Sequence, residues 1–400
     1  MTARPSISDQ QRRRRIAVRH RLAPSRRAHS VSEAAAAVVG LHATEPANVH
    51  LAAFARSGAS RADVDLALYD QRSVVKQLAM RRTVFAFPTA LLPAVWGSAA
   101  ARVAEQQRAR LAREVVKHGI AADGPAWVER ATEAVLATLA TRGPLTTAQL
   151  RSALPLLEER LSYAAGKSYA SNTPIAPRVL TALAASGAVV RGANDGGWKT
   201  SRPRWTLTDQ WLGPQPEPLD AAAGYAVLVE GWLRSFGPGT EDDLVWWLGA
   251  TRAAVRRALA TLDATPVGLE DGTTGLVLPD DLAPVPDPGR WAALLPALDP
   301  TVMGWQRRGF YLGAHERLLV DRNGNAGPSA WLDGRVVGGW TQKEDGQVVV
   351  VLCQEVDRAG MRLLEAEAAR LSEWLDGEVV RTIYQSPLVR SGTGPSSSSM

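Results

Sequence analysis

The sequence contains little of what metal centres and disulfide-stabilised folds require. Cys353 is the only cysteine in 400 residues, which excludes an internal disulfide and a cysteine-based zinc site. The six histidines are scattered and match no metal-binding spacing, so we expect no metal and no cofactor. No apolar run approaches the roughly 18 residues that span a bilayer. Since no apolar segment follows the basic N-terminus either, we expect a cytoplasmic protein without membrane contact.

Catalytic signatures are also scarce, whereas positive charge is plentiful. The chain has no P-loop, no Gly-x-Ser-x-Gly motif and no carboxylate pair with diagnostic spacing. Its net charge is +6 and its pI is near 9.7, values that fit a polyanionic partner. A short N-terminal stretch holds eight arginines: Arg12, Arg13, Arg14, Arg15, Arg19, Arg21, Arg26 and Arg27. A solvated helix face and a phosphate-binding arm explain this cluster equally well.

One local pattern, typical of the winged helix-turn-helix, occurs three times along the chain. It consists of a helix, a short capped helix, an amphipathic helix and a β-hairpin. In the third copy Thr240 and Thr251 are placed to cap the second and third helices, and 267–269 and 276–278 form the hairpin. The second copy repeats the Gly-Pro break before a capping threonine, Thr146, and has an insertion at 156–177. The first copy is less regular, with segments 10–22, 31–39, 41–54 and 63–80 before a strand at 83–87.

The hairpin of the second copy is the best candidate for DNA contact outside the N-terminal cluster. It carries Trp198 and Trp205 together with four cationic residues: Arg191, Lys199, Arg202 and Arg204. A basic, aromatic hairpin suits contact with phosphates and a groove, although a merely solvated hairpin would have a similar composition.

The C-terminal third changes to short strands separated by turns. Strands are expected at 309–313, 317–321, 329–332, 335–341 and 348–354, followed by a helix at 358–376. We therefore expect an α+β protein with winged-helix units at 10–90, 124–212 and 220–280. A small β-barrel or antiparallel sheet at 290–390 and a disordered tail at 391–400 complete this division.

Five segments together resemble the winged-helix DNA glycosylase superfamily typified by the AlkZ and YcaQ proteins. They are 40–46 (GLHATEP), 80–83 (MRRT), 236–240 (FGPGT), 295–300 (LPALDP) and 333–338 (DGRVVG). The resemblance implies winged-helix units and a β-barrel around duplex DNA, with excision of alkylated purines. The family's catalytic motif is Gln, an apolar residue, then Gln or Asp. The matching positions here are His42, Ala43 and Thr44, so both polar members differ.

The altered motif leaves two interpretations open. In the first, a neutral His42 accepts a proton from water, Thr44 holds that water, and Glu45 favours a cationic sugar, which suffices because an alkylated purine already leaves readily. In the second, His42 is hydrogen-bonded in the core, Thr44 is a helix cap, and Glu45 with Pro46 begins the next helix. The first predicts a DNA glycosylase, and the second a non-catalytic protein that recognises duplex DNA or lesions.

Other residues are weighed in the same way. The resemblance implies that Arg81 and Arg82 lie close to the active cleft, where they are candidates for DNA contact. Of Trp246 and Trp247, we expect one in the core and the other at a contact between units, rather than stacked on a base. Asp299 is expected to be a turn residue. The expected partner is double-stranded DNA, bound by a monomer.

Overall fold

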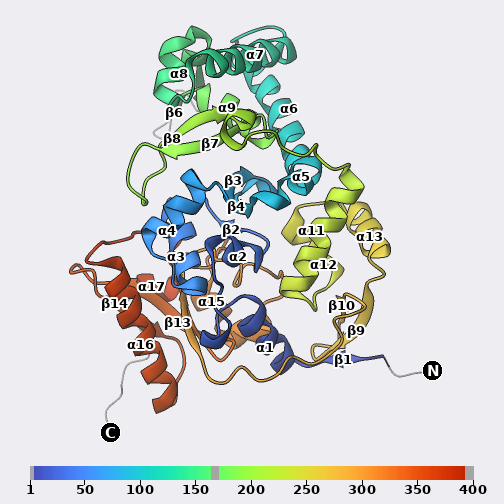
Figure 1. The fold of residues 1–400 in the computed structure, drawn as a ribbon, viewed down its shortest axis with the longest axis vertical. Helices are drawn as coiled ribbons and strands as arrows, with labels where there is room; N and C mark the ends of the chain where they lie inside the picture. The colour runs from blue at the N-terminus through green and yellow to red at the C-terminus, as the bar shows by residue number, and fades with distance from the viewer. Residues whose placement is uncertain (1–3, 164–170, 392–400) are drawn as a thin grey trace.

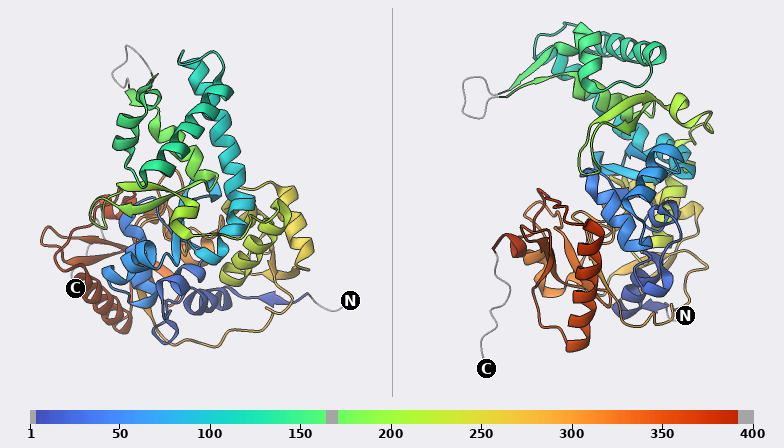
Figure 2. Two further views of the ribbon diagram at one scale, coloured as in Figure 1. Left: turned by 45° about the horizontal axis from the view of Figure 1, so that its top comes forward. Right: turned by 60° about the vertical axis from the view of Figure 1, so that its left-hand side comes forward.

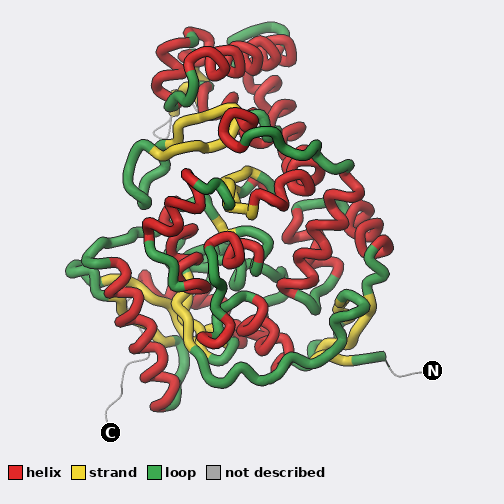
Figure 3. The backbone as a smooth tube through the Cα atoms, viewed as in Figure 1, coloured by secondary structure: helices red, strands yellow, loops and turns green. Residues whose placement is uncertain are grey.

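The computed structural model describes residues 4–163 and 171–391 and has an α+β fold (Figure 1). The strands of the described residues are short and belong to five separate sheets of two to four strands, between many helices (Figure 3). All strand pairs are antiparallel except β1 (Ser6–Ile7), which runs parallel to β9 (Thr265–Leu269). The expected α+β class is confirmed.

The first unit surrounds a three-stranded sheet of order β2-β4-β3. Its elements are α1 (Asp9–Arg19), α2 (Val31–Ala36), β2 (Leu41–His42), α3 (Pro46–Ser57), α4 (Arg61–Asp65), β3 (Val74–Leu78), β4 (Val84–Pro88) and α5 (Leu92–Val95). Two expected segments are each divided. Residues 41–54 contain both β2 and α3, because Pro46 begins a helix after the strand. Residues 63–80 contain the end of α4, a single π-helical turn (Leu66–Asp70) and β3.

The second unit is joined to the first by α6 (Ala101–Lys117), which runs away from the centre of the molecule (Figure 1). Its elements are α7 (Gly124–Arg142), α8 (Thr147–Ala153), α9 (Ala176–Ala185), the hairpin β7 (Val189–Asn194) with β8 (Pro203–Leu207), and α10 (Thr208–Leu212). The insertion forms a second hairpin, β5 (Arg160–Tyr163) with β6 (Ser171–Pro174). Thr146 caps α8 as expected, since its side chain accepts a hydrogen bond from the Gln149 amide.

The third unit has the same element order, with α11 (Ala221–Phe236), α12 (Glu241–Leu248), α13 (Arg252–Thr261), β9 and β10 (Thr274–Val277). The caps expected from the sequence are present. Thr240 forms a capping box with Asp243, and Thr251 accepts from the Ala254 amide. Both units therefore have a helix, helix, helix and hairpin succession, and their assignment as winged helices stays a prediction.

The C-terminal unit is an open antiparallel sheet, and no barrel closes within the described residues. The sheet has the order β11 (Ala292–Leu295), β12 (Ser329–Leu332), β13 (Arg335–Gln342) and β14 (Val348–Leu352), and α16 (Arg358–Leu375) and α17 (Pro387–Ser391) accompany it. The strands expected at 309–313 and 317–321 are wrong, because α14 (Gly309–Leu312) and α15 (Glu316–Leu319) occupy these segments. Phe310, Tyr311 and Leu312 are all buried, and this packing overrides their β propensity. Apart from Ser391, the expected tail lies outside the described residues.

The cores show which parts of the chain depend on one another. One large core, from Ile16 to Leu388, combines side chains of the first, third and C-terminal units with Val190 of the second unit. A separate core, from Leu111 to Trp205, belongs to the second unit together with α6. The second unit accordingly projects from the rest of the molecule, with its β7–β8 hairpin facing the first unit (Figures 1 and 2).

Candidate active site

His42 lies in β2, where the backbone ladder fixes its position. It pairs with Phe85 of β4, whose ring meets the imidazole edge-on at 5.5 Å between centroids. The side chain is only 6% exposed. Neither ring nitrogen has a hydrogen-bond partner among the described residues, and Nδ1 is fully buried. His42 is therefore a buried histidine whose polar atoms the fold leaves unused, which is unusual for a structural residue.

Burial determines the protonation state of this ring. Burial first, and then the nearby positive charge of Arg81, together lower the pKa of His42 to about 4, against the opposing effect of Asp299. At neutral pH the imidazole is consequently uncharged, with one N–H to donate and one lone pair to accept. An assisting group of this kind orients water without adding positive charge to the site.

Thr44, the last motif residue, and Glu45, which follows it, lie in different surroundings. Thr44 is exposed in the loop between β2 and α3, and it caps no helix. Glu45 directly precedes Pro46, the first residue of α3, but its carboxylate does not cap that helix. Instead it accepts hydrogen bonds from the Thr382 hydroxyl at 2.7 Å and the Ile383 amide at 3.0 Å. Glu45, directly after the motif, thus joins the first unit to the C-terminal segment.

Arg81 lies beside the motif and is held by an indole. Its guanidinium carbon is 4.1 Å from the ring centroid of Trp246, and Arg308 lies 5.3 Å from the same centroid. Burial lowers the pKa of Arg81 to about 10, and its Nε has no partner. Gly249 makes this approach possible, since a Cβ there would lie 3.2 Å from the Arg81 amide and the residue has a φ of 61°.

The remaining residues of this region divide between core and surface. Trp247 is buried against Phe85 and Phe236, as expected for one of the two tryptophans. Asp299 is fully buried, and both its oxygens bond the Arg56 guanidinium, at 2.6 and 2.9 Å. Its carboxylate is therefore satisfied by a structural ion pair. Arg82 is exposed and has no ion-pair partner among the described residues.

Most N-terminal arginines bind within the protein. Arg15 is 2% exposed and bonds Asp281, while Arg12 is 6% exposed and lies between Asp9 and the ring of Phe310. Neither side chain is available to a phosphate. Arg13 donates to the Phe310 carbonyl at 2.9 Å, and Arg14 pairs with Asp287 at 2.6 Å, and both keep part of their surface in solvent. Much of the cluster therefore attaches α1 to the linker that follows the third unit.

Some cationic side chains of the β7–β8 hairpin form ion pairs within the protein. Lys199 pairs with Glu378 at 2.7 Å, and Arg204 pairs with Asp195 at 2.7 Å. Trp198 lies against Trp374 and His50, so the tip of the hairpin rests on both the first and the C-terminal units. Of the expected DNA contacts in this hairpin, the Arg202 and Arg191 side chains have no ion-pair partner among the described residues.

Comparisons with known proteins agree with this geometry. The family model described as "DNA glycosylase AlkZ-like" matches residues 35–374. The chain belongs to the AlkZ-like DNA glycosylase family. Among solved structures, the Streptomyces sahachiroi DNA glycosylase AlkZ is similar with a TM-score of 0.71 and 22% identity, covering 94% of this chain and 98% of that one. No curated protein matches the sequence.

Membership of the AlkZ-like family supports a DNA-glycosylase-like function in DNA repair, with DNA as the partner. Within this AlkZ-like chain, none of the helices in the described ranges 4–163 and 171–391 is long and apolar enough to cross a membrane.

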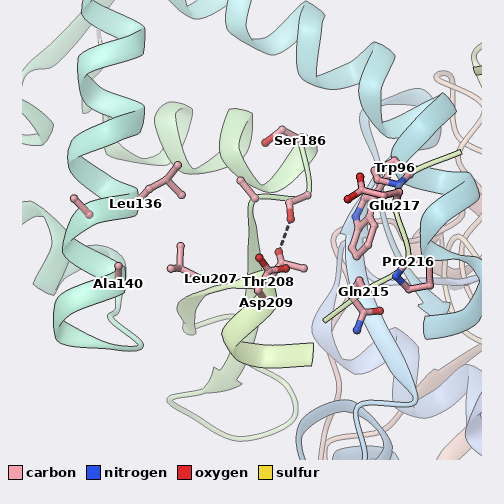
Figure 4. A pocket seen from close by; sticks show the side chains of 14 residues that line it. Trp96, Leu136, Ala140, Ser186, Leu207, Thr208, Asp209, Gln215, Pro216 and Glu217 are labelled. Atoms are coloured by element: carbon pink, nitrogen blue, oxygen red, sulfur yellow. Dashed lines mark hydrogen bonds between the residues drawn. The ribbon is translucent and has the colours of Figure 1, made fainter. Parts of the chain in front are cut away.

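Sequence reasoning missed Lys76 and Tyr69, which line a cavity together with Thr44, and Arg308, which lies beside Trp246. The available signal for Lys76 was its position between apolar residues of the segment Val74–Leu78, where a charged side chain is unusual. A larger cavity, near 610 Å³, lies elsewhere, between α7, α10 and the linker that leads to α11 (Figure 4). Its ionisable lining residues are Asp209 and Glu217, and these acidic side chains do not favour binding of a phosphate.

Proposed function

We propose that this protein is a DNA glycosylase that hydrolyses the N-glycosidic bond of N7- or N3-alkylated purines in duplex DNA. The observation that carries the proposal is the neutral His42 at the family's motif position, with ring nitrogens that no neighbour uses. A structural histidine at this depth would ordinarily be hydrogen-bonded, as His20 is to Thr301 and the Ser235 carbonyl.

The reaction asks little of the protein. In an alkylated purine the C1′–N bond breaks with its electron pair moving to a base that is already cationic, which leaves as a neutral molecule. A water oxygen then bonds to C1′ and releases its proton. The protein has to stabilise an oxocarbenium-like sugar and orient that water. With a pKa of about 4, His42 acts as a hydrogen-bond acceptor for the water while the proton passes to solvent.

Thr44 and Glu45 support this arrangement in different ways. The exposed Thr44 hydroxyl is free to hold the water from a second direction. The Glu45 carboxylate, fixed by Thr382 and Ile383, provides negative charge that favours a cationic sugar. For DNA binding we retain Arg81, Arg82, Arg202 and the partly exposed Arg13 and Arg14 as phosphate contacts, with Arg191, Lys199 and Arg204 contributing from the hairpin. The buried Arg12 and Arg15 are left out.

The decisive experiment is excision from a duplex that contains one N7-methylguanine. Wild-type protein should release the base, and His42→Ala should abolish release while duplex affinity stays within about twofold. Thr44→Val keeps the volume of an exposed residue and should lower the rate roughly tenfold or more, the contribution expected of one positioned hydrogen bond. Release by His42→Ala at the wild-type rate would refute the assignment.

A non-catalytic, lesion-recognising protein is the second candidate. It is favoured by the replacement of both polar motif residues, since His42 and Thr44 stand where the resemblance places glutamine and glutamine or aspartate. Under this function the wild type would bind alkylated duplex in preference to normal duplex without releasing any base. The same assay, combined with a binding measurement, separates the two functions.

A further inference from the structure

A small cavity lies directly beside the motif, where the second unit meets the first. It has a volume of about 120 Å³, which is room for several atoms the size of a water oxygen. Ala43, Thr44 and Pro46 form one wall, and Lys76 of β3 and Arg191 of β7 form another. β7 packs next to β3 at this point, as the views in Figures 1 and 2 also show.

Two cations face this cavity, and no acid lines it. The Lys76 ammonium donates to the Tyr69 hydroxyl at 3.1 Å. The Arg191 side chain makes no hydrogen bond or ion pair among the described residues, and its Nη1 is fully buried. Its guanidinium carbon lies over the ring of Trp205, 4.8 Å from the ring centroid. The other side of the cavity consists of neutral polar residues, namely Asn194, Thr200 and Ser201.

The nearby acids are engaged elsewhere. Asp65, the carboxylate that favours the charged form of Lys76, bonds His50 Nε2 at 3.0 Å. Asp195 of the hairpin is paired with Arg204. Burial accordingly lowers the pKa of Lys76 to about 8 and that of Arg191 to about 10. Neither cation has a direct ion-pair partner among the described residues, and burying such charges destabilises a fold, so their presence together calls for an anion in the cavity.

We propose that this cavity binds one phosphate group, with Lys76 and Arg191 as its cationic ligands. A planar guanidinium and a point-like ammonium are the usual pair of side chains around a phosphate. Because Thr44 lines the same cavity, a phosphodiester bound there flanks the nucleotide presented to the motif. The DNA source of the phosphate rests on the proposed function, whereas the affinity of the cavity for a phosphate does not.

The first arm of the test uses inorganic phosphate. At constant ionic strength, 10 mM phosphate in place of chloride should raise the Tm of the full-length protein by about 2 °C, through binding to the native state alone. Arg191→Gln and Lys76→Met remove one charge each with little loss of volume, and should abolish this rise. Both variants should be at least as stable as the wild type without phosphate, because each removes an unneutralised charge.

The second arm uses duplexes that carry a stable abasic-site analogue, which fixes the register and cannot be excised. A neutral methylphosphonate replaces one phosphate at a time near the analogue. In the wild type, one linkage should weaken binding about tenfold, the effect of losing one charge-assisted contact. Arg191→Gln should already bind about tenfold more weakly and should be insensitive to that linkage. Arg202→Gln, a matched change in the same hairpin but outside the cavity, should keep both the sensitive linkage and the rise in Tm.

The outcomes are distinct. A rise in Tm without a sensitive linkage supports a phosphate site filled by free phosphate. A linkage that is sensitive in the wild type and not in Arg191→Gln supports a DNA phosphodiester. If phosphate leaves the Tm unchanged and Arg191→Gln responds to every linkage as the wild type does, the proposal is overturned. Both arms are independent of base release, so a failure to excise N7-methylguanine does not affect them.

Discussion

Replacing His42 with glutamine should make the protein more resistant to acid. In the native state burial holds the pKa of His42 near 4, whereas an unfolded histidine titrates near 6.5. As the pH falls below 6.5 the unfolded chain takes up a proton that the native state refuses, so stability is lost from pH 6.5 down to about 4. Above pH 6.5 this histidine contributes no pH dependence.

The size of the effect follows from the two pKa values. At pH 5 the loss is about 2 kcal/mol, and it approaches about 3 kcal/mol at pH 4, from roughly 1.4 kcal/mol for each unit of pKa difference. Glutamine has a similar volume, does not titrate and restores one residue of the family motif. The difference in urea midpoint, variant minus wild type, should therefore be larger at pH 5 than at pH 8.

The assay is urea unfolding followed by tryptophan fluorescence at pH 8, 6 and 5. His20, which is fully buried and whose pKa is also well below its ordinary value, makes both proteins acid-sensitive. Only the difference between the two proteins reports on His42. If wild type and His42→Gln lose stability in parallel between pH 8 and 5, the buried, neutral histidine described above is refuted. For activity, the same pKa predicts that excision by the wild type does not fall as the pH drops through 6.5, in contrast to the behaviour of an ordinary histidine.

Three further expectations concern the surroundings of the site. Arg56→Met leaves the Asp299 carboxylate buried without its partner and should lower the unfolding free energy by about 3–5 kcal/mol, as measured by urea unfolding; a cost below 1 kcal/mol would contradict it. Gly249→Ala should destabilise by about 1 kcal/mol or more because of its positive φ, and a displaced Arg81 should appear as weaker duplex binding. Arg202→Ala should reduce the salt dependence of duplex binding by about one unit without affecting Tm, whereas Arg15→Ala should lower Tm because it leaves buried partners unsatisfied; the reverse pattern would show that Arg202 is structural.

The sequence predicts features that depend on neighbouring residues, such as helix caps, better than features that depend on distant parts of the chain. Thr146, Thr240 and Thr251 could be identified as caps because a cap depends on residues three positions away. β3 was not recognised, since a strand buried on both faces lacks the alternation that distinguishes a strand from a helix. The apolar segments 309–313 and 317–321 are predicted as strands from their β propensity. They contain the helices α14 and α15, because packing of their side chains in the core decides their conformation.

The protonation state and the ion pairs of the candidate site could not be predicted from the sequence. The position of His42 followed from the motif, but its low pKa depends on burial and on Arg81, which the sequence does not specify. Similarly, Arg15 reads as a DNA contact until its partner Asp281, 266 positions away, is seen to enclose it. Charge alone therefore overstated the surface available to DNA.

The division of the cores determines an order of events during synthesis. The main core of the second unit and of the end of α6 comes from residues 111–205, so this core can form once that stretch has left the ribosome, before the hairpin tip finds its C-terminal partner Trp374. The first unit emerges earlier but cannot be completed, because Arg56 is unpaired until Asp299 appears and Glu45 awaits Thr382. A fragment that ends near residue 230 and has been released from the ribosome should therefore hold a protease-resistant second unit attached to a digestible first one. The candidate active site, although encoded near the start of the chain, is assembled last.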